Sequence, residues 1–234
     1  MKKIKCLILV GLFLSLLVPL FSSPVDQGIA LYNQGKAQEA ATYLENLLKK
    51  EPANAEALAY LALSLNVVAH KIDFQTQQGA DKLKKLSQKA VDYAQKSLKI
   101  KKNAPAYSAL AQSYSHMVEA GEMPQKLVDY IRENSLEALK LNDKDAPAMI
   151  CLAYIYLRAP KEYGGEPEKA RQLLEKVKKL DGENSYYFLG MAEYYSLQGN
   201  KTQAETTARQ VLKMPENGNQ LRAKLFLAKL TDDK

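Results

Sequence analysis

Polar and apolar positions recur in the same order at three places in the chain. Each stretch opens on Asn or Asp, continues through alanines and ends in Leu-Ala; the three begin at Asn54, Asn103 and Asp145. Each also follows a segment in which leucines mix with lysines. Because Asn and Asp are favoured residues at the start of a helix, the repeated pattern predicts repeated helix starts.

Extending this pattern along the chain predicts five pairs of helices and one final helix. The expected first helices are Pro24–Gln34, Asn54–Lys71, Ala104–Glu119, Ala146–Arg158 and Asn184–Leu197. Their expected partners are Ala37–Lys50, Ala80–Ile100, Pro124–Leu141, Pro167–Leu180 and Lys201–Lys213, followed by a single helix over Gly218–Leu230.

Composition agrees with an all-helical fold. The 234 residues include 29 Ala and 35 Leu, but only 10 Val, 8 Ile and 6 Thr. Strong helix formers therefore far outnumber β-branched residues, which excludes a β-sandwich, a barrel or a doubly wound α/β fold.

Small residues recur at corresponding places in the predicted helices. On first helices they are Gly28, Ala62, Ala111, Ala153, Ala192 and Ala228, at intervals of 34, 49, 42, 39 and 36 residues; on second helices they are Ala40, Ala90, Ala170 and Ala204, with Ile131 as a departure. Turn glycines are expected at Gly35, Gly165 and Gly199, and Pro52 ends the first unit.

These features resemble the tetratricopeptide repeat, a helix-turn-helix unit of 34 residues in which small residues let the two helices cross closely. The resemblance implies an all-α, right-handed solenoid of about five degenerate repeats over residues 24–53, 54–102, 103–144, 145–183 and 184–217. A capping helix over 218–231 then completes a domain spanning 23–234, and its outer side is expected to expose Arg222, Lys224, Lys229 and Asp232.

The first 22 residues predict a secretory signal peptide. Three lysines precede an uncharged apolar run, Cys6–Phe21, which is shorter than the roughly 20 residues that cross a membrane. Cleavage after Ser22 predicts an exported protein, periplasmic or secreted, without stable membrane insertion; an uncleaved anchor is the alternative. Cleavage also lowers the net charge from +7 to +4, which is too small to predict a nucleic-acid partner.

The resemblance implies that first helices line the concave side of the solenoid. Aligning the repeats with one another therefore identifies candidate groove residues. They are Tyr60, Leu63, Asn66, Ser108, Gln112, His116, Ile150, Tyr154, Arg158, Tyr186, Leu189 and Glu193. Tyrosine offers a ring face and a hydroxyl and is common at binding surfaces. A protein or peptide segment is the expected partner of this groove. For the tyrosines, packing between repeats is the competing interpretation.

The insertions suggest a second function. The segments 72–80 and 159–167 exceed the repeat length, and the second contains a Gly-Gly turn before an acidic residue. This turn faintly resembles the periplasmic repeat partner of some tripartite solute transporters, which implies an accessory protein that binds an apolar solute or lipid.

No catalytic, metal-binding or cofactor-binding motif is present in the sequence. Cys151 lies in an apolar segment and is expected to be a buried, inert thiol, while His70 is expected to act as a charged partner of its helix C-terminus. Basic runs on the second helices are expected to be solvated, or to make weak contact with anionic envelope polymers. The sequence therefore predicts a non-enzymatic binding protein.

Overall fold

The computed structural model describes residues 23–122, 125–215 and 218–232, which contain helices and no strand. The predicted signal peptide lies outside this part of the chain. The helices are α1 (Pro24–Asn33), α2 (Ala37–Lys50), α3 (Ala55–Ala69), α4 (Gln77–Ile100), α5 (Ala104–Glu119), α6 (Gln125–Leu141), α7 (Ala146–Arg158), a 3₁₀ turn η1 (Lys161–Tyr163), α8 (Pro167–Asp181), α9 (Ser185–Leu197), α10 (Lys201–Leu212) and α11 (Asn219–Asp232). None of these helices is long and apolar enough to cross a membrane.

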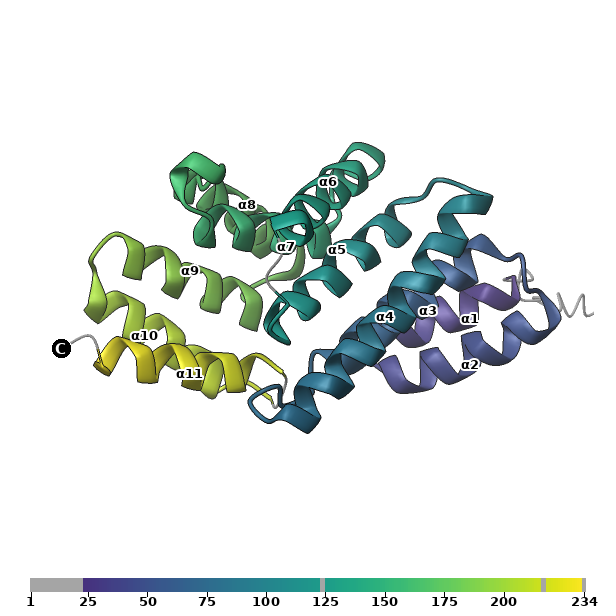
Figure 1. Cartoon of the computed structure of the whole chain (residues 1–234), viewed down its shortest axis with the longest axis horizontal. Coiled ribbons are helices and arrows are strands. Elements are labelled where there is room, and N and C mark those ends of the chain that lie inside the picture. Colours follow the sequence, from purple (N-terminus) through teal and green to yellow (C-terminus); the bar gives the residue numbers. More distant parts are fainter. Residues whose placement is uncertain (1–22, 123–124, 216–217, 233–234) are drawn as a thin grey trace, which may run out of the picture.

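The helices of the described residues pair in chain order, α1 with α2 through to α9 with α10, and the pairs follow one another as a solenoid (Figure 1). The first helices α1, α3, α5, α7 and α9 pack one against the next, and each second helix packs against its own partner and the following first helix. The last helix, α11, packs on α9 and α10 without a partner of its own among the described helices. The expected all-α solenoid of helix pairs with a final helix is confirmed for the described part of the chain.

Side-chain caps start the helices at the expected places. The side chains of Asn54, Asn103, Asp145 and Asn184 each accept a hydrogen bond from the backbone N–H three residues later, at 2.9 to 3.0 Å. Each cap satisfies an N–H group that the helix itself leaves without a partner. The insertion at 72–80 forms a short connection and the first turn of α4, which is 24 residues long.

The turn before α8 differs from the expectation in one glycine. Gly35 and Gly199 adopt positive φ angles of 75°, but in the fourth repeat the residue with positive φ is Gly164, not Gly165. At Gly165 a Cβ atom would lie 1.8 Å from the carbonyl oxygen of Ala159. Glycine is needed there because the backbone of the insertion passes too close for any side chain.

Small residues occupy the points where helices cross. Eight predicted alanines, Ala40, Ala62, Ala90, Ala111, Ala153, Ala170, Ala192 and Ala204, are fully buried, and Ile131 is 2% exposed. The expectation for Ala228 is wrong: this residue is exposed, because no second helix follows α11 in the described part of the chain. Ala223 is the fully buried alanine of that helix.

A matched pair of substitutions tests this assignment. Replacing Ala111 by leucine is expected to destabilise the protein by about 1–3 kcal/mol, because added methylene groups overpack a closed helix crossing. The same change at exposed Ala228 is expected to alter stability by less than about 0.5 kcal/mol. Urea unfolding followed by circular dichroism measures both. Equal losses would contradict the assignment of Ala111 as a crossing point.

Candidate functional site

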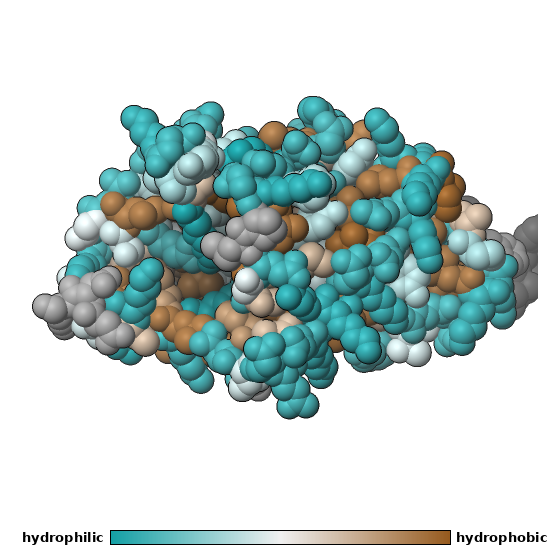
Figure 2. Space-filling model, viewed as in Figure 1, coloured by the Kyte–Doolittle hydropathy of each residue, from teal (hydrophilic) through white to brown (hydrophobic). Residues whose placement is uncertain are grey.

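A cavity of about 610 Å³ lies on the concave side of the solenoid. Figure 2 shows a hollow between the α9–α11 end and the centre of the molecule, with apolar side chains on its floor. Its walls come mainly from α1, α3, α5, α6, α7, α9 and α11, with single residues from η1 and α8. They are mainly apolar and include Val67, Val118, Val128, Ile131, Pro147, Ile150, Cys151 and Ile155, with the rings of Tyr32, Tyr154 and Tyr186. Cavities of this size and character are typical of small-molecule sites.

Seven of the twelve predicted groove residues line this cavity: Asn66, Gln112, His116, Ile150, Tyr154, Arg158 and Tyr186. The other five do not line it. Leu63 and Leu189 are buried in the core between helices at 4% and 2% exposure. Ser108 donates a hydrogen bond to Asp145 at 2.7 Å, the Tyr60 ring packs edge-on against Tyr32, and Glu193 pairs with Arg158. Neighbouring first helices pack closely enough to bury positions that the alignment places on the inner face.

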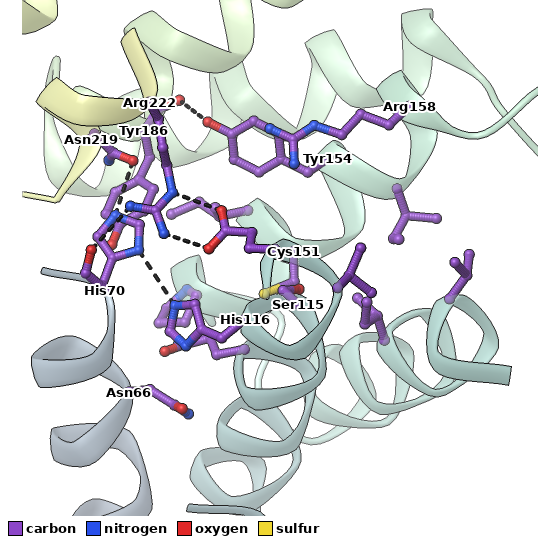
Figure 3. A pocket seen from close by; sticks show the side chains of 18 of the residues that line it. Asn66, His70, Ser115, His116, Cys151, Tyr154, Arg158, Tyr186, Asn219 and Arg222 are labelled. Atoms are coloured by element: carbon purple, nitrogen blue, oxygen red, sulfur yellow. Dashed lines mark hydrogen bonds and ion pairs between the residues drawn. The ribbon is translucent and has the colours of Figure 1, made fainter. Parts of the chain in front are cut away.

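Four residues that are far apart in the sequence meet at one side of the cavity: His70, Glu119, Asn219 and Arg222, here called the clasp. Figure 3 shows His70, Asn219 and Arg222 together at this side. Arg222 forms a two-pronged ion pair with Glu119, with Nε at 2.7 Å from Oε1. It also donates to the backbone oxygens of His70 (3.0 Å) and Gly218 (2.8 Å). The Arg222 and Glu119 side chains are only 8% and 18% exposed.

The clasp corrects the expectation that Arg222 is exposed on the outer side of the last helix. The guanidinium instead lies 5.2 Å from the centre of the Phe74 ring, which belongs to the insertion at 72–80. A Cβ atom at Gly218 would lie 1.9 Å from the carbonyl oxygen of His70, so α11 begins in direct contact with the end of α3. The last helix therefore closes the concave groove at this side.

Hydrogen bonds through the clasp assign the histidine tautomers. Asn219 Nδ2 donates to Ser185 Oγ (2.9 Å), so Asn219 Oδ1 accepts from His70 Nε2 (3.0 Å). A neutral His70 then has a bare Nδ1, which accepts from His116 Nε2 at 3.4 Å. His116 is left with a bare Nδ1, and this buried atom has no hydrogen-bond partner among the described residues.

Burial keeps both histidines neutral. Loss of solvation, assisted by the charge of Arg222, lowers the pKa of His70 to about 3 and that of His116 to about 4. The expectation of a charged His70 at the helix C-terminus is therefore wrong, because the ring is enclosed beside a guanidinium. The same Arg222 outweighs burial at Glu119 and lowers the pKa of that carboxyl to about 2.

A second ion pair lies at the opposite part of the cavity wall. Arg158 donates from Nη2 and Nε to the two carboxylate oxygens of Glu193, at 2.7 and 3.0 Å. Its guanidinium also lies 4.5 Å from the centre of the Tyr154 ring, and the Tyr154 hydroxyl donates to the Tyr186 carbonyl at 3.3 Å. The Arg158 side chain is 52% exposed and that of Glu193 is 16% exposed, so the guanidinium is the part of this cluster that solvent reaches most easily.

The described residues contain no group of three His, Cys, Asp or Glu side chains able to hold a metal ion. Cys151 is 7% exposed, and burial raises the pKa of its thiol to about 12. A thiol that remains protonated at neutral pH is a poor nucleophile. Because its lining is mainly apolar, the cavity can enclose an apolar group and offer it a few hydrogen-bonding atoms.

Comparisons with known proteins bear on the fold. A family model of the tetratricopeptide repeat matches residues 25–54. A thermophilic TPR protein of Thermus thermophilus is 20% identical and superposes with a TM-score of 0.57, covering 89% of this chain and 97% of that chain. At this identity the likeness shows the fold alone.

Two further solved structures are less similar. A tetratricopeptide repeat protein of Parabacteroides merdae is 17% identical with a TM-score of 0.47, over 88% of this chain and 82% of that one. YrrB, described as a TPR protein with an unusual peptide-binding site, is 15% identical with a TM-score of 0.45, over 86% of this chain and 89% of that one. A comparison with curated proteins finds no significant match.

Proposed function

We propose that the chain, whose fold is that of tetratricopeptide repeat proteins, is a non-catalytic scaffold that binds a partner protein through its concave side. The observation that carries this proposal is the cluster of Tyr154, Arg158 and Glu193 beside the apolar cavity, in which the Arg158 side chain is exposed to solvent. Tyrosine and arginine dominate the binding energy of many interfaces, and an apolar side chain of a partner segment would fill the cavity behind them.

We further propose that the scaffold acts outside the cytoplasm, in the periplasm or after secretion. This proposal rests on the basic start and the apolar run of residues 1–22. The protein isolated from an envelope fraction is then expected to have the mass of a chain that starts at Ser23. A mass that includes residues 1–22 would instead support the uncleaved anchor.

A pull-down from envelope extract tests partner binding. The double variant Tyr154→Ala with Arg158→Ala is expected to lose a protein that the unmodified chain retains, by at least about tenfold in recovery. The matched control is Tyr194→Ala with Arg171→Ala, which removes the same residue types where both contact Glu168 away from the cavity. Equal retention by the double variant and the unmodified chain would refute the groove assignment.

A second candidate function is the binding of an apolar solute or lipid, as in an accessory protein for solute transport. The observation that favours it is the clasp, because contact between α11 and the end of α3 closes one side of the groove and leaves a bounded cavity. An extended peptide needs an open groove, whereas a compact ligand needs an enclosed one.

A further inference from the structure

We propose that the cavity binds an amphiphile with a carboxylate head group, and that Arg158 binds this head group through the edge of its guanidinium formed by Nη1 and Nη2. This inference deepens the second candidate function, the binding of an apolar solute or lipid, and rests on it. Three observations carry it: the unused donors of Arg158, the exposure of its side chain, and its place at the end of an apolar row of cavity residues.

The two arginines of the cavity lining differ in how many of their N–H donors are in use. A guanidinium group has five such donors. Arg222 uses four of them, two toward Glu119 and two toward backbone oxygens. Arg158 uses two, one each from Nε and Nη2, both toward Glu193. Both hydrogens of Arg158 Nη1 and the second hydrogen of Nη2 therefore have no partner among the described residues.

The unused donors of Arg158 have the geometry that a carboxylate needs. Glu193 occupies the edge of the guanidinium formed by Nε and Nη2, and the adjacent edge, formed by Nη1 and Nη2, offers two parallel N–H groups. Two parallel donors match the two oxygens of a carboxylate in a charge-assisted pair. The Tyr154 ring, 4.5 Å from the guanidinium, and Glu193 together hold Arg158 in one orientation, so little ordering remains when a ligand binds.

Glu193 compensates the charge of Arg158 without covering it. The Glu193 side chain is 16% exposed, whereas that of Arg158 is 52% exposed. An anion that arrives from solvent therefore meets the guanidinium first, with the carboxylate on its other, more buried edge. A cation finds both Glu193 oxygens already bonded to Arg158, and the attraction of the exposed acid Asp181 in the lining is screened by solvent.

Arg158 lies where the cavity meets solvent. Among the described residues of the lining, five are exposed: Gln125, Arg158, Pro160, Tyr163 and Asp181. Three of them belong to residues 158–163, here called the mouth, which contain the end of α7 and η1. Arg132 donates to the Tyr163 carbonyl at 2.6 Å, and the Gly165 N–H donates to the Pro160 carbonyl at 2.9 Å. These bonds hold the mouth in place, and the insertion after α7 supplies most of it.

An apolar row leads from the mouth into the cavity. The lining residues of α7 recur three or four positions apart and so share one helix face; they are Pro147, Ile150, Cys151, Tyr154, Ile155 and Arg158. Arg158 ends this row. Figure 3 shows Tyr154 and Arg158 apart from the clasp, with Cys151 and Ser115 between them. A ligand whose carboxylate is bound at Arg158 can therefore place its apolar chain along α7 toward the clasp.

Three probes with eight carbon atoms test the inference on the unmodified protein by calorimetric titration at pH 7.5: octanoate, 1-octanol and octylamine, which is protonated at this pH. We expect octanoate to bind about tenfold more tightly than 1-octanol, since only octanoate makes a two-pronged, charge-assisted contact. Octylamine is expected to bind more weakly than 1-octanol. Decanoate is expected to bind about tenfold more tightly than octanoate, because two more methylene groups leave water.

Variants of the ion pair test the role of Arg158. Arg158→Met with Glu193→Gln removes the donors without leaving a lone carboxylate, and is expected to abolish the preference for octanoate while the affinity for 1-octanol stays within about twofold. Glu193→Gln alone is expected to raise the affinity for octanoate about threefold, since it removes a like charge. The control is Arg209→Met: Arg209 also donates from Nε and Nη2 to a glutamate but does not line the cavity, so octanoate binding is expected to be unchanged.

A bulky residue in the cavity tests where the chain of the ligand lies. Val128→Trp is expected to abolish binding of all the probes, because the half-buried Val128 lines the cavity from α6. Circular dichroism checks that each variant is folded before it is titrated. If Val128→Trp does not fold, Ile155→Trp fills the same space from α7.

The outcomes separate the inference from the function on which it rests. If none of the probes binds the unmodified protein, the apolar-ligand function itself is wrong. If 1-octanol or octylamine binds as tightly as octanoate and Val128→Trp blocks them, the carboxylate class is wrong and the apolar-ligand function stands. If the preference for octanoate survives in the double variant, Arg158 does not bind the head group. Binding of octanoate that Val128→Trp leaves unchanged would overturn the placement in this cavity.

Discussion

Replacing Arg222 by methionine is expected to lower the free energy of unfolding by about 3–5 kcal/mol. The substitution keeps much of the side-chain volume but leaves the Glu119 carboxylate, which is 18% exposed, without the guanidinium that holds it in the folded state. It also removes both hydrogen bonds from the guanidinium to the backbone at His70 and Gly218. Urea unfolding measures the loss, and hydrogen exchange locates it.

Two further variants serve as controls for this result. The pair Glu119→Leu with Arg222→Met removes both charges and is expected to recover most of the lost stability, since no buried charge remains at this contact. Arg209→Met breaks an exposed pair with Glu205 in α10 and is expected to cost less than about 0.5 kcal/mol. If Arg222→Met costs no more than Arg209→Met, the clasp does not hold α11 against the rest of the solenoid.

The solenoid itself could be predicted because its determinants are local. A cap such as Asn103 acts on an N–H group three residues away, and an alanine such as Ala111 acts on the helix that crosses it within the same repeat or the next. These interactions recur in each unit, so they leave a repeated signal in the sequence. Ala228 is misassigned where the repetition ends and its partner helix is missing from the described chain.

The clasp could not be predicted because it depends on the curvature of the whole solenoid. Arg222 and His70 are 152 residues apart, and their meeting reflects small rotations accumulated over four repeats of unequal length. One local signal was present: Leu225 and Phe226 lie one helical turn after Arg222. An arginine next to apolar residues on one helix face indicates a paired, buried charge as readily as an exposed one.

The residues that line the cavity also fall into two groups, those that the sequence predicts and those that it does not. Alignment of first helices identified Tyr154 and Arg158, because both stand on the inner face of α7. It missed Val128 and Ile131, which reach the cavity from the second helix α6, and Asn219 from α11. A rule that places only first helices on the concave side omits a second helix whose side chains extend past its partner.

Lowering the pH from 7 to 5 is expected to destabilise the protein by about 4 kcal/mol through the two clasp-side histidines, His70 and His116. Their pKa values lie near 3 and 4 in the folded state, below the usual value of 6.5. The unfolded chain therefore binds more protons than the folded chain in this range, and stability falls as the pH falls. Each histidine contributes about 2 kcal/mol between pH 7 and pH 5.

The carboxyl of Glu119 acts in the same direction at lower pH. Its pKa of about 2 in the folded state lies below the usual 4.5, so its contribution is present above pH 4.5 and is lost as the pH falls toward 2. Urea unfolding at pH 7, 6 and 5 therefore isolates the histidines. The variant His70→Gln with His116→Gln is expected to be less stable at pH 7 but to lose most of this pH dependence. If the free energy of unfolding of that variant falls with pH as steeply as that of the unmodified protein, other groups cause the acid sensitivity. The rings of His70 and His116 would then become protonated while the clasp stays closed.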